Sequence, residues 1–69
     1  MTGKEMKEIR RELGISTREL GYALGYRGNE NTVSVAIRLY ESGRREIPPW
    51  IGRLVEMFGR HGVPPEWYA

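Results

Sequence analysis

Two short segments decide the fold of this chain: I-S-T-R-E-L-G-Y-A-L-G, from Ile15 to Gly25, and A-I-R-L-Y-E-S-G-R-R, from Ala36 to Arg45. In both, apolar residues recur at the three- to four-residue spacing that is typical of an amphipathic helix. Between them stand ten mostly polar residues, Y-R-G-N-E-N-T-V-S-V, from Tyr26 to Val35. The stretch predicts two neighbouring helices, and the residues between them form either a longer turn or extra turns at the front of the second helix.

Local signals mark the ends of the first helix of this pair. The run S-T-R-E is a capping box, in which the Ser16 hydroxyl and the Glu19 carboxylate each accept from an otherwise unpaired backbone N–H. Gly25 is suited to the positive φ that often ends a helix. Gly21, inside the helix, costs about 0.5 to 1 kcal/mol relative to alanine. We therefore expect Gly21 to allow close approach by another helix.

Three further helices are expected around this one. The first covers about residues 4–13 and is stopped by Gly14, and the third covers 31–40, with Asn29 or Asn31 as its N-cap. The fourth begins at the Pro48-Pro49 pair and reaches about residue 60, because proline is tolerated at the first helical position. The prediction is a compact all-α domain of four to five helices, spanning 1–69, with the helix pair at about 16–42 and the carboxyl-terminal helix and tail at 49–69.

Length and composition narrow the class of protein. A chain of 69 residues has room for one small core, and the absence of cysteine excludes a disulfide framework and a thiolate metal site. No apolar run approaches the roughly 18 residues that suggest a membrane span, so we expect no membrane association and a cytoplasmic location. The net charge is only +2, so the placement of the arginines matters more than their number.

Three runs give the chain a family resemblance: E-I-R-R-E-L-G-I-S from Glu8, S-T-R-E-L-G-Y-A-L-G from Ser16, and Y-E-S-G-R-R-E-I-P from Tyr40. From Met6 to about Leu54 the chain resembles the DNA-binding domain of the Xre/Cro repressor family. The resemblance implies a lambda-repressor-like helix-turn-helix domain. It also implies a structural ion pair between Arg10 and Glu41. The chain departs from the family in having Gly21 where alanine is usual, Tyr40 where tryptophan or leucine is common, and a longer stretch between the paired helices.

The length of that stretch can be tested by the residues it would bury. With the family's usual turn, the core positions six and nine residues after Gly25 would be Asn31 and Ser34, which are both polar. With six residues inserted, the same positions become Ile37 and Tyr40, which are apolar. Burial therefore requires the insertion.

One face of the third helix is the candidate for reading DNA bases. At 100° per residue, Val33, Ala36, Ile37 and Tyr40 share the side that packs, and Asn31, Val35 and Arg38 share the opposite side. In a major groove asparagine can pair with adenine, arginine with guanine, and valine can touch a thymine methyl group. The residues predicted to read bases are Asn31, Val35 and Arg38, flanked by Thr32, Ser34 and Leu39. The alternative is that Asn31 is only a cap and Val35 only a boundary residue.

Contacts to the DNA backbone have other candidates. The start of the second helix offers unpaired N–H groups and a positive dipole end to a phosphate, beside Thr17 and Arg18. Arg44 and Arg45 follow the third helix, and Arg27 lies in the connection. Phosphate contacts supply affinity without selecting sequence. The alternative is a solvated charged surface.

The aromatic residues near the carboxyl terminus exceed what one small core needs. Aromatic residues and methionine are enriched at interface centres, and the dimer interface is predicted to contain Trp50, Met57, Trp67 and Tyr68. A two-fold dimer would read an inverted repeat. The alternative is that the tail folds back over the fourth helix within one subunit.

The predicted function is a sequence-specific DNA-binding regulator: a dimeric repressor of its own operon, of the kind found among phage regulators and anti-CRISPR-associated autorepressors. The alternative is a protein-interaction module or antitoxin-like protein. An enzyme is not expected, because the chain has no Asp or Cys and its one histidine, His61, lies at a predicted helix end. No metal, cofactor or small-molecule ligand is expected either, and the expected partners are double-stranded DNA and a second copy of the chain.

Overall fold

The computed structural model describes residues 1–68, and these form helices joined by short connections, with no β-strand among them. A single 3-10 turn, η1 (Pro65–Trp67), lies in the carboxyl-terminal segment. The four α-helices are α1 (Gly3–Leu13), α2 (Thr17–Ala23), α3 (Glu30–Glu41) and α4 (Pro49–His61). The prediction of an all-α fold is confirmed, and each predicted helix is present with ends within one or two residues of those expected.

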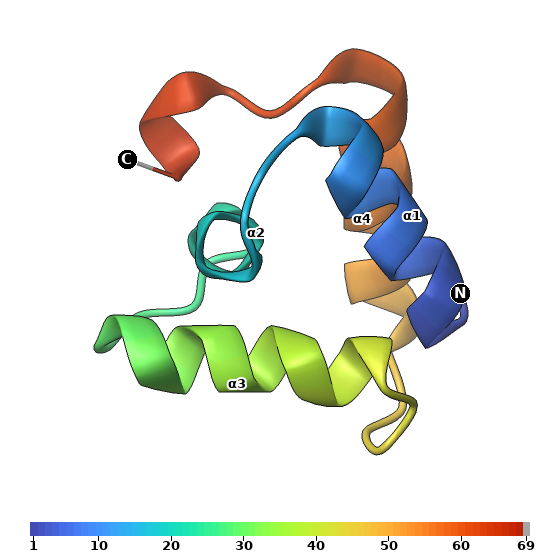
Figure 1. Cartoon of the computed structure of the whole chain (residues 1–69). Helices are drawn as coiled ribbons and strands as arrows, with labels where there is room; N and C mark the ends of the chain where they lie inside the picture. The colour runs from blue at the N-terminus through green and yellow to red at the C-terminus, as the bar shows by residue number, and fades with distance from the viewer. Residues whose placement is uncertain (69) are drawn as a thin grey trace.

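The main contacts between helices are those of α2 with α3, of α1 with α4 and of α1 with α3. α1 and α4 lie side by side, α3 runs across beneath them, and α2 is seen nearly end-on above α3 (Figure 1). The carboxyl-terminal segment, residues 62–68, crosses from the end of α4 to the side of α2 (Figure 1). α3 is therefore covered on one side only and has a free side facing away from the other helices.

The core lies where the four helices meet, and every helix supplies at least one fully buried side chain to it. From the carboxyl-terminal segment, Val63 and Tyr68 pack against its edge. Burying one large aliphatic or aromatic side chain is worth about 1.5–3 kcal/mol, so these few residues supply most of the favourable free energy of a chain this small. The largest fully buried side chains are Met6, Leu20, Val33, Ile37, Ile51, Val55 and Phe58.

Caps define the ends of the paired helices as predicted. Ser16 Oγ accepts from the Glu19 N–H at 3.0 Å, and Glu19 Oε1 accepts from the Ser16 N–H at 2.8 Å. The N-cap of α3 is Asn29, whose Oδ1 accepts from the Thr32 N–H at 2.9 Å. Of the two residues considered for this cap, Asn31 is therefore excluded, and its side chain is free for another role.

The ten residues between the two paired segments divide between connection and helix. Tyr26–Asn29 lie in the connection, whereas Glu30–Val35 form the first half of α3. Two hydrogen bonds of tyrosine side chains hold the connection. Tyr22 Oη donates to the Gly28 carbonyl at 3.3 Å, and the hydroxyls of Tyr26 and Tyr40 lie 2.7 Å apart. Burial and the hydrogen bond to Tyr40 raise the pKa of Tyr26 to about 12. Six of the ten residues therefore form the front half of α3.

Gly21 is the point of closest approach between α2 and the front of α3. A Cβ atom built on Gly21 would overlap Cγ1 of Val33 and would lie 3.4 Å from the Val33 carbonyl oxygen. Val33 is fully buried and β-branched, so its side chain has little freedom to move aside. The expectation that Gly21 allows close packing of another helix is confirmed. The residue that packs against Gly21 is Val33, in the front half of α3.

Gly21→Ala is expected to destabilise the protein in spite of alanine's higher helix propensity. Overpacking typically costs about 1–3 kcal/mol, and the propensity gain offsets about 0.5–1 kcal/mol, leaving a net loss of about 1 kcal/mol. In a Val33→Ala background the overlap is gone, so the same substitution should instead be neutral or stabilising. Urea unfolding of the four proteins of this cycle measures the change of sign. An equal effect of Gly21→Ala in both backgrounds would contradict this account.

None of the helices formed by residues 1–68 combines the length and the apolar character required to cross a bilayer.

Candidate nucleic-acid interface

The free side of α3 carries most of the residues predicted to read bases. Asn31, Thr32, Val35 and Arg38 are exposed, and Leu39 is half-buried. On the opposite side Ile37 is fully buried and Tyr40 is 4% exposed. The division of α3 into a packed side and an outward side therefore matches the division predicted from the sequence.

Ser34 is the exception and corrects the prediction. It is buried, with 9% of its surface exposed, and so does not flank the outward side. The reason is helical geometry: Ser34 precedes Ile37 by three residues and Glu41 by seven, which puts it on their side of the helix. A small hydroxyl side chain fits the edge of the packed face, so the polarity of Ser34 was a poor guide to its exposure.

The start of α2 lies beside the start of α3. Arg18 Nη1 contacts Glu30 Oε1 at 3.0 Å, and the two side chains are 42% and 70% exposed, respectively. The capping box already uses the N–H groups of Ser16 and Glu19. The N–H groups of Thr17 and Arg18 are then the two in this turn that a phosphate could contact. Thr17 and Arg18 thus lie next to the outward side of α3, but Arg18 is paired with a carboxylate rather than free.

Arg44 and Arg45, which are also predicted to contact phosphates, follow α3 in a turn that folds back on the helix. Gly43 has φ of 81°, and the Arg45 N–H donates to the Leu39 carbonyl at 3.1 Å. The Arg45 guanidinium lies over the Tyr40 ring, 5.8 Å from its centroid. Arg44 and Arg45 are both exposed. At 1.5 Å per residue α3 is about 18 Å long. Arg18 stands beside its front, and Arg44 and Arg45 follow its end.

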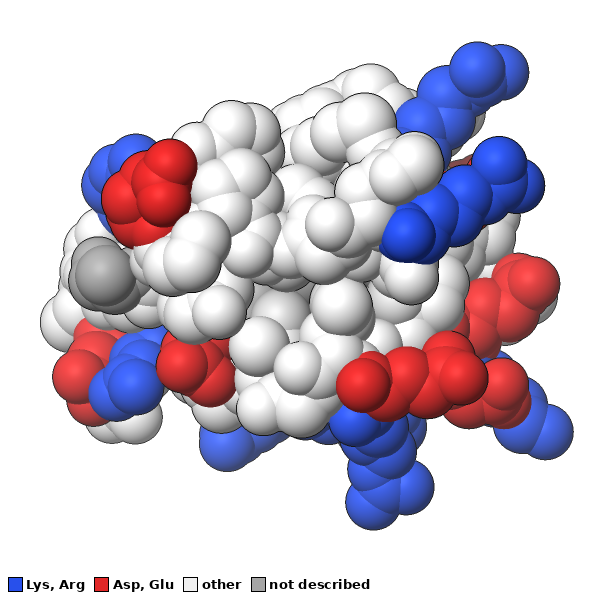
Figure 2. All heavy atoms as spheres, turned by 90° about the horizontal axis from the view of Figure 1, so that it is seen from above, with Lys and Arg blue, Asp and Glu red and all other residues white. Residues whose placement is uncertain are grey.

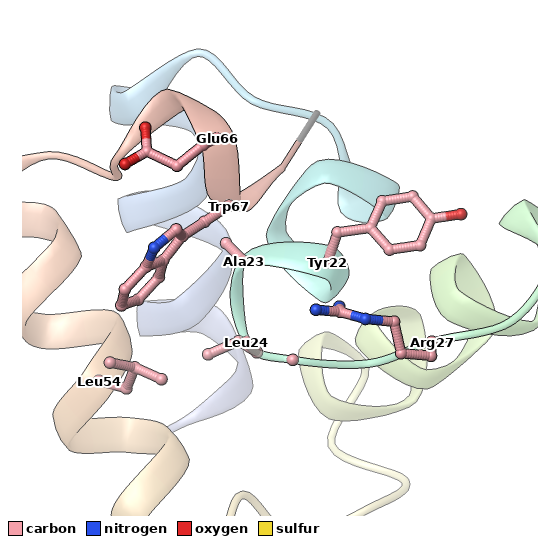
Figure 3. A pocket seen from close by; sticks show the side chains of 8 residues that line it. Tyr22, Ala23, Leu24, Arg27, Leu54, Glu66 and Trp67 are labelled. Carbon is pink, nitrogen blue, oxygen red and sulfur yellow. The ribbon is translucent and has the colours of Figure 1, made fainter.

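Arg27 points in a different direction from the other arginines. Its Nη1 donates to the adjacent Tyr26 carbonyl at 2.9 Å. In Figure 3 its guanidinium extends below Tyr22 toward Leu24, at the edge of a pocket whose other wall includes Trp67. Arg27 also lines a second hollow, together with Thr32, Val35 and Arg45. The structure therefore places Arg27 between the pocket beside Trp67 and the outward side of α3.

The ion pair that the family resemblance implied is present. Arg10 Nε lies 2.7 Å from Glu41 Oε2, and Arg10 Nη2 lies 3.2 Å from Glu41 Oε1. Arg10 Nη1 also donates to the Ile15 carbonyl at 3.1 Å. The two side chains are only 15% and 8% exposed. This bidentate pair ties α1, the α1–α2 connection and the end of α3 together, which is a structural role.

The residues predicted for a dimer interface divide into two groups. Trp50 and Met57 of α4 are 61% and 48% exposed. Trp67 packs edge-on against Phe58, with ring centroids 5.9 Å apart, and Tyr68 is half-buried against the core. The tail thus folds back within one subunit, as the alternative interpretation proposed, although Trp67 keeps 45% of its surface exposed.

The face covered by the carboxyl-terminal segment is mostly uncharged. Figure 2 views this face, on which charged side chains stand chiefly at the edges. It includes an open hollow of about 490 Å³, lined by Met57, Phe58, His61, Gly62, Val63, Pro64, Pro65 and Trp67. The charged and the apolar candidate surfaces therefore lie on different sides of the molecule.

Sequence reasoning missed two contributors to the interface. Glu30 places a carboxylate at the front of α3, beside Arg18. Tyr26 joins the connection to α3 through Tyr40. The available signal for the second was a tyrosine on either side of the front half of α3, Tyr26 before it and Tyr40 after it. The pairing of Glu30 depends on how α2 and α3 cross.

Within residues 1–68 no group of three His, Cys, Asp or Glu side chains is arranged to hold a metal ion. Comparison of the chain with family models, with curated proteins and with solved structures finds no match.

Proposed function

We propose that the chain is a sequence-specific DNA-binding regulator that inserts α3 into the major groove through a lambda-repressor-like helix-turn-helix. The observation that carries the proposal is the outward side of α3, where Asn31, Val35 and Arg38 are exposed together. The major groove admits one α-helix and presents a distinct donor and acceptor pattern for each base pair. An amide, an aliphatic group and a guanidinium on one helix face match three different base edges.

The charges around α3 support the same function. Thr17 stands by its front, next to the Arg18–Glu30 pair, and Arg44 and Arg45 follow its end. Groups that would bind phosphate, chiefly Arg44 and Arg45, therefore flank the residues that would read bases. Phosphate contacts of this kind set the register of a protein on the duplex. The net charge of only +2 is consistent with this arrangement, because local rather than total charge governs binding to phosphates.

Repression by a dimer completes the proposal. Two copies joined through the uncharged face or the exposed side of α4 would present two recognition helices to an inverted repeat, with half-sites about 34 Å apart. A protein that covers such a site at its own promoter would be controlled by its concentration. Trp50 and Met57 are the exposed residues best suited to the contact.

The decisive experiment measures the affinity of wild type and Arg38→Ala for the preferred duplex, selected from random DNA, and for a scrambled duplex. Arg38 is exposed on the outward side of α3, and one bidentate arginine–guanine contact is worth about 1–3 kcal/mol of discrimination. We expect Arg38→Ala to lose that amount on the preferred duplex and little on the scrambled one. Wild-type affinity should fall with salt, with a slope of about −0.9 per neutralised phosphate.

Arg44→Ala is the matched control, because Arg44 is also exposed but lies beyond the helix. It should weaken both duplexes similarly and reduce the salt slope by about 1. A wild-type protein with no preference for any duplex would disprove the proposed function.

A second function is favoured by a separate observation, the apolar hollow and the exposed Trp50 and Met57. These residues also suit a protein partner, as in an interaction module or antitoxin-like protein. Trp50→Ala would then abolish partner binding, whereas Arg38→Ala would leave it intact. The opposite dependence supports the DNA-binding function.

A further inference from the structure

A pocket lies where four segments meet: the end of α2, the connection from α2 to α3, the middle of α4, and η1 (Figure 3). Its volume is about 370 Å³, within the range of about 300–1,000 Å³ that is usual for small-molecule sites. The lining side chains that govern its chemistry are Leu24, Arg27, Leu54, Glu66 and Trp67. The pocket therefore has room for a small organic molecule.

The apolar wall of the pocket is held in place by the core. Trp67 packs edge-on against Phe58, with ring centroids 5.9 Å apart, and the Trp67 N–H donates to the Pro64 carbonyl at 2.9 Å. Leu54 packs against the same core, and in Figure 3 the Trp67 indole points toward it. Trp67 nevertheless keeps 45% of its surface exposed. The pocket thus offers an aromatic and aliphatic surface that is already fixed before a ligand binds.

The opposite wall carries a guanidinium with unused donors. In Figure 3 the Arg27 guanidinium extends toward Leu24, on the side of the pocket away from Trp67. One N–H of its Nη1 donates to the Tyr26 carbonyl at 2.9 Å. Within residues 1–68 no carboxylate forms an ion pair with Arg27. The remaining N–H groups can bind a carboxylate through two parallel hydrogen bonds, which suit the planar guanidinium.

Glu66 limits which anions the pocket can accept. It lines the pocket, and in Figure 3 its carboxylate points away from Arg27. The lining thus carries one positive and one negative charge, which cancel. A polyanion, such as a nucleic acid or a phosphate ester, would gain little net attraction here. A single carboxylate placed at Arg27 keeps its attraction to the guanidinium and stays apart from Glu66.

We propose that this pocket binds a small aromatic monocarboxylate, whose carboxylate accepts hydrogen bonds from Arg27 and whose ring lies against Trp67 and Leu54. An aromatic ring suits this wall, because aromatic pairs in edge-on or offset geometry gain more free energy than their buried area alone provides. No small-molecule ligand was expected from the sequence, in which Arg27 and Trp67 are far apart and share no motif. The site does not depend on the proposed DNA-binding function.

Three probes of related structure test the site: 3-phenylpropanoate, its neutral analogue 3-phenylpropanamide, and propanoate, which lacks the ring. Each is titrated into the isotope-labelled protein at constant pH and ionic strength, and the signals of the Trp67 indole N–H and the Arg27 Nε–H are followed by NMR. A ligand as small as 3-phenylpropanoate is expected to bind with a dissociation constant of about 1 mM. The amide and propanoate should each bind about tenfold more weakly, because the first lacks the charge-assisted hydrogen bonds and the second lacks the buried ring.

Arg27→Met should weaken the binding of 3-phenylpropanoate about tenfold and leave the binding of 3-phenylpropanamide unchanged, because it removes the cation and keeps a long side chain. The variant should remain folded, since Arg27 is exposed and its guanidinium bonds only to the adjacent residue. Arg11→Met is the matched control. Arg11 is exposed on α1 and does not line the pocket, so this variant should bind every probe as the wild type does.

Each result either supports the site or overturns it. Saturable shifts of both signals, with the preference for the carboxylate lost in Arg27→Met, would support it. Equal affinities of the wild type for the carboxylate and the amide, or of the wild type and Arg27→Met for the carboxylate, would overturn it. Propanoate that binds as tightly as 3-phenylpropanoate would reveal only a bare cation, and no saturable shift with 3-phenylpropanoate would mean that the pocket binds no such ligand. The DNA measurements on Arg38 and Arg44 are independent of all these results.

Discussion

Arg10→Ala is expected to lower the free energy of unfolding by about 3–5 kcal/mol, which is the typical effect of removing one partner of a buried ion pair. The substitution eliminates both contacts to Glu41 and the bond to the Ile15 carbonyl. It leaves the Glu41 carboxylate, with a side chain only 8% exposed, without a cation. Native domains have about 0.05–0.15 kcal/mol of stability per residue, or about 3–10 kcal/mol for 69 residues, so the substitution should remove a large part of the stability. Urea unfolding followed by circular dichroism measures the loss.

Two further proteins make this expectation specific. Arg11→Ala is the matched control, because Arg11 is the next residue on the same helix and is exposed. It should change stability by less than about 0.5 kcal/mol. The double variant Arg10→Met with Glu41→Leu replaces the pair by apolar side chains, and it should recover most of the stability, as such replacements often do. Equal losses in Arg10→Ala and Arg11→Ala would refute the structural role of the pair.

Ile37→Ala should also be strongly destabilising, with an expected loss of about 2–5 kcal/mol of unfolding free energy. Ile37 is fully buried on the packed side of α3. Alanine would remove its transfer free energy and would leave a cavity at the contact between α3 and the rest of the core. Thermal unfolding should show a large decrease in Tm.

Val35→Ala is the control for Ile37→Ala, because it replaces a β-branched residue two positions away on the exposed side of the same helix. It should leave stability within about 0.5 kcal/mol of wild type, and any effect should be on DNA binding. Comparable losses of stability in the two variants would mean that the packed and exposed sides of α3 have been assigned wrongly. The pair of variants therefore tests the register without reference to function.

Local signals predicted the helices well, and the reason is that caps depend on neighbouring residues. The capping residue and the residue whose N–H it accepts lie three positions apart, as in Ser16 with Glu19 and Asn29 with Thr32. The contacts that mark the start of each helix are therefore visible as spacing in the sequence. The register of α3 was predictable for a similar reason. Of the two placements of the core positions after Gly25, only one buries two apolar residues, Ile37 and Tyr40. The hydrophobic effect favours that placement.

The candidate interface was predicted less completely, because its details depend on contacts between distant segments. The exposure of Asn31, Val35 and Arg38 followed from periodicity. The burial of Ser34 did not, since a small polar side chain can lie on either side of a helix edge. The contact between Arg18 and Glu30 arises only when α2 and α3 cross, and no spacing rule covers it.

The sequence by itself determined which residues of α3 point inward and where each helix begins, because both follow from local hydrogen bonding and from the period of the apolar residues. Only the tertiary structure decided that Glu30–Val35 form the front half of α3 and that this front packs on Gly21 through Val33. The physical reason is steric: a helix can extend along α2 only where α2 has no side chain in its way, and that fit exists only between folded surfaces.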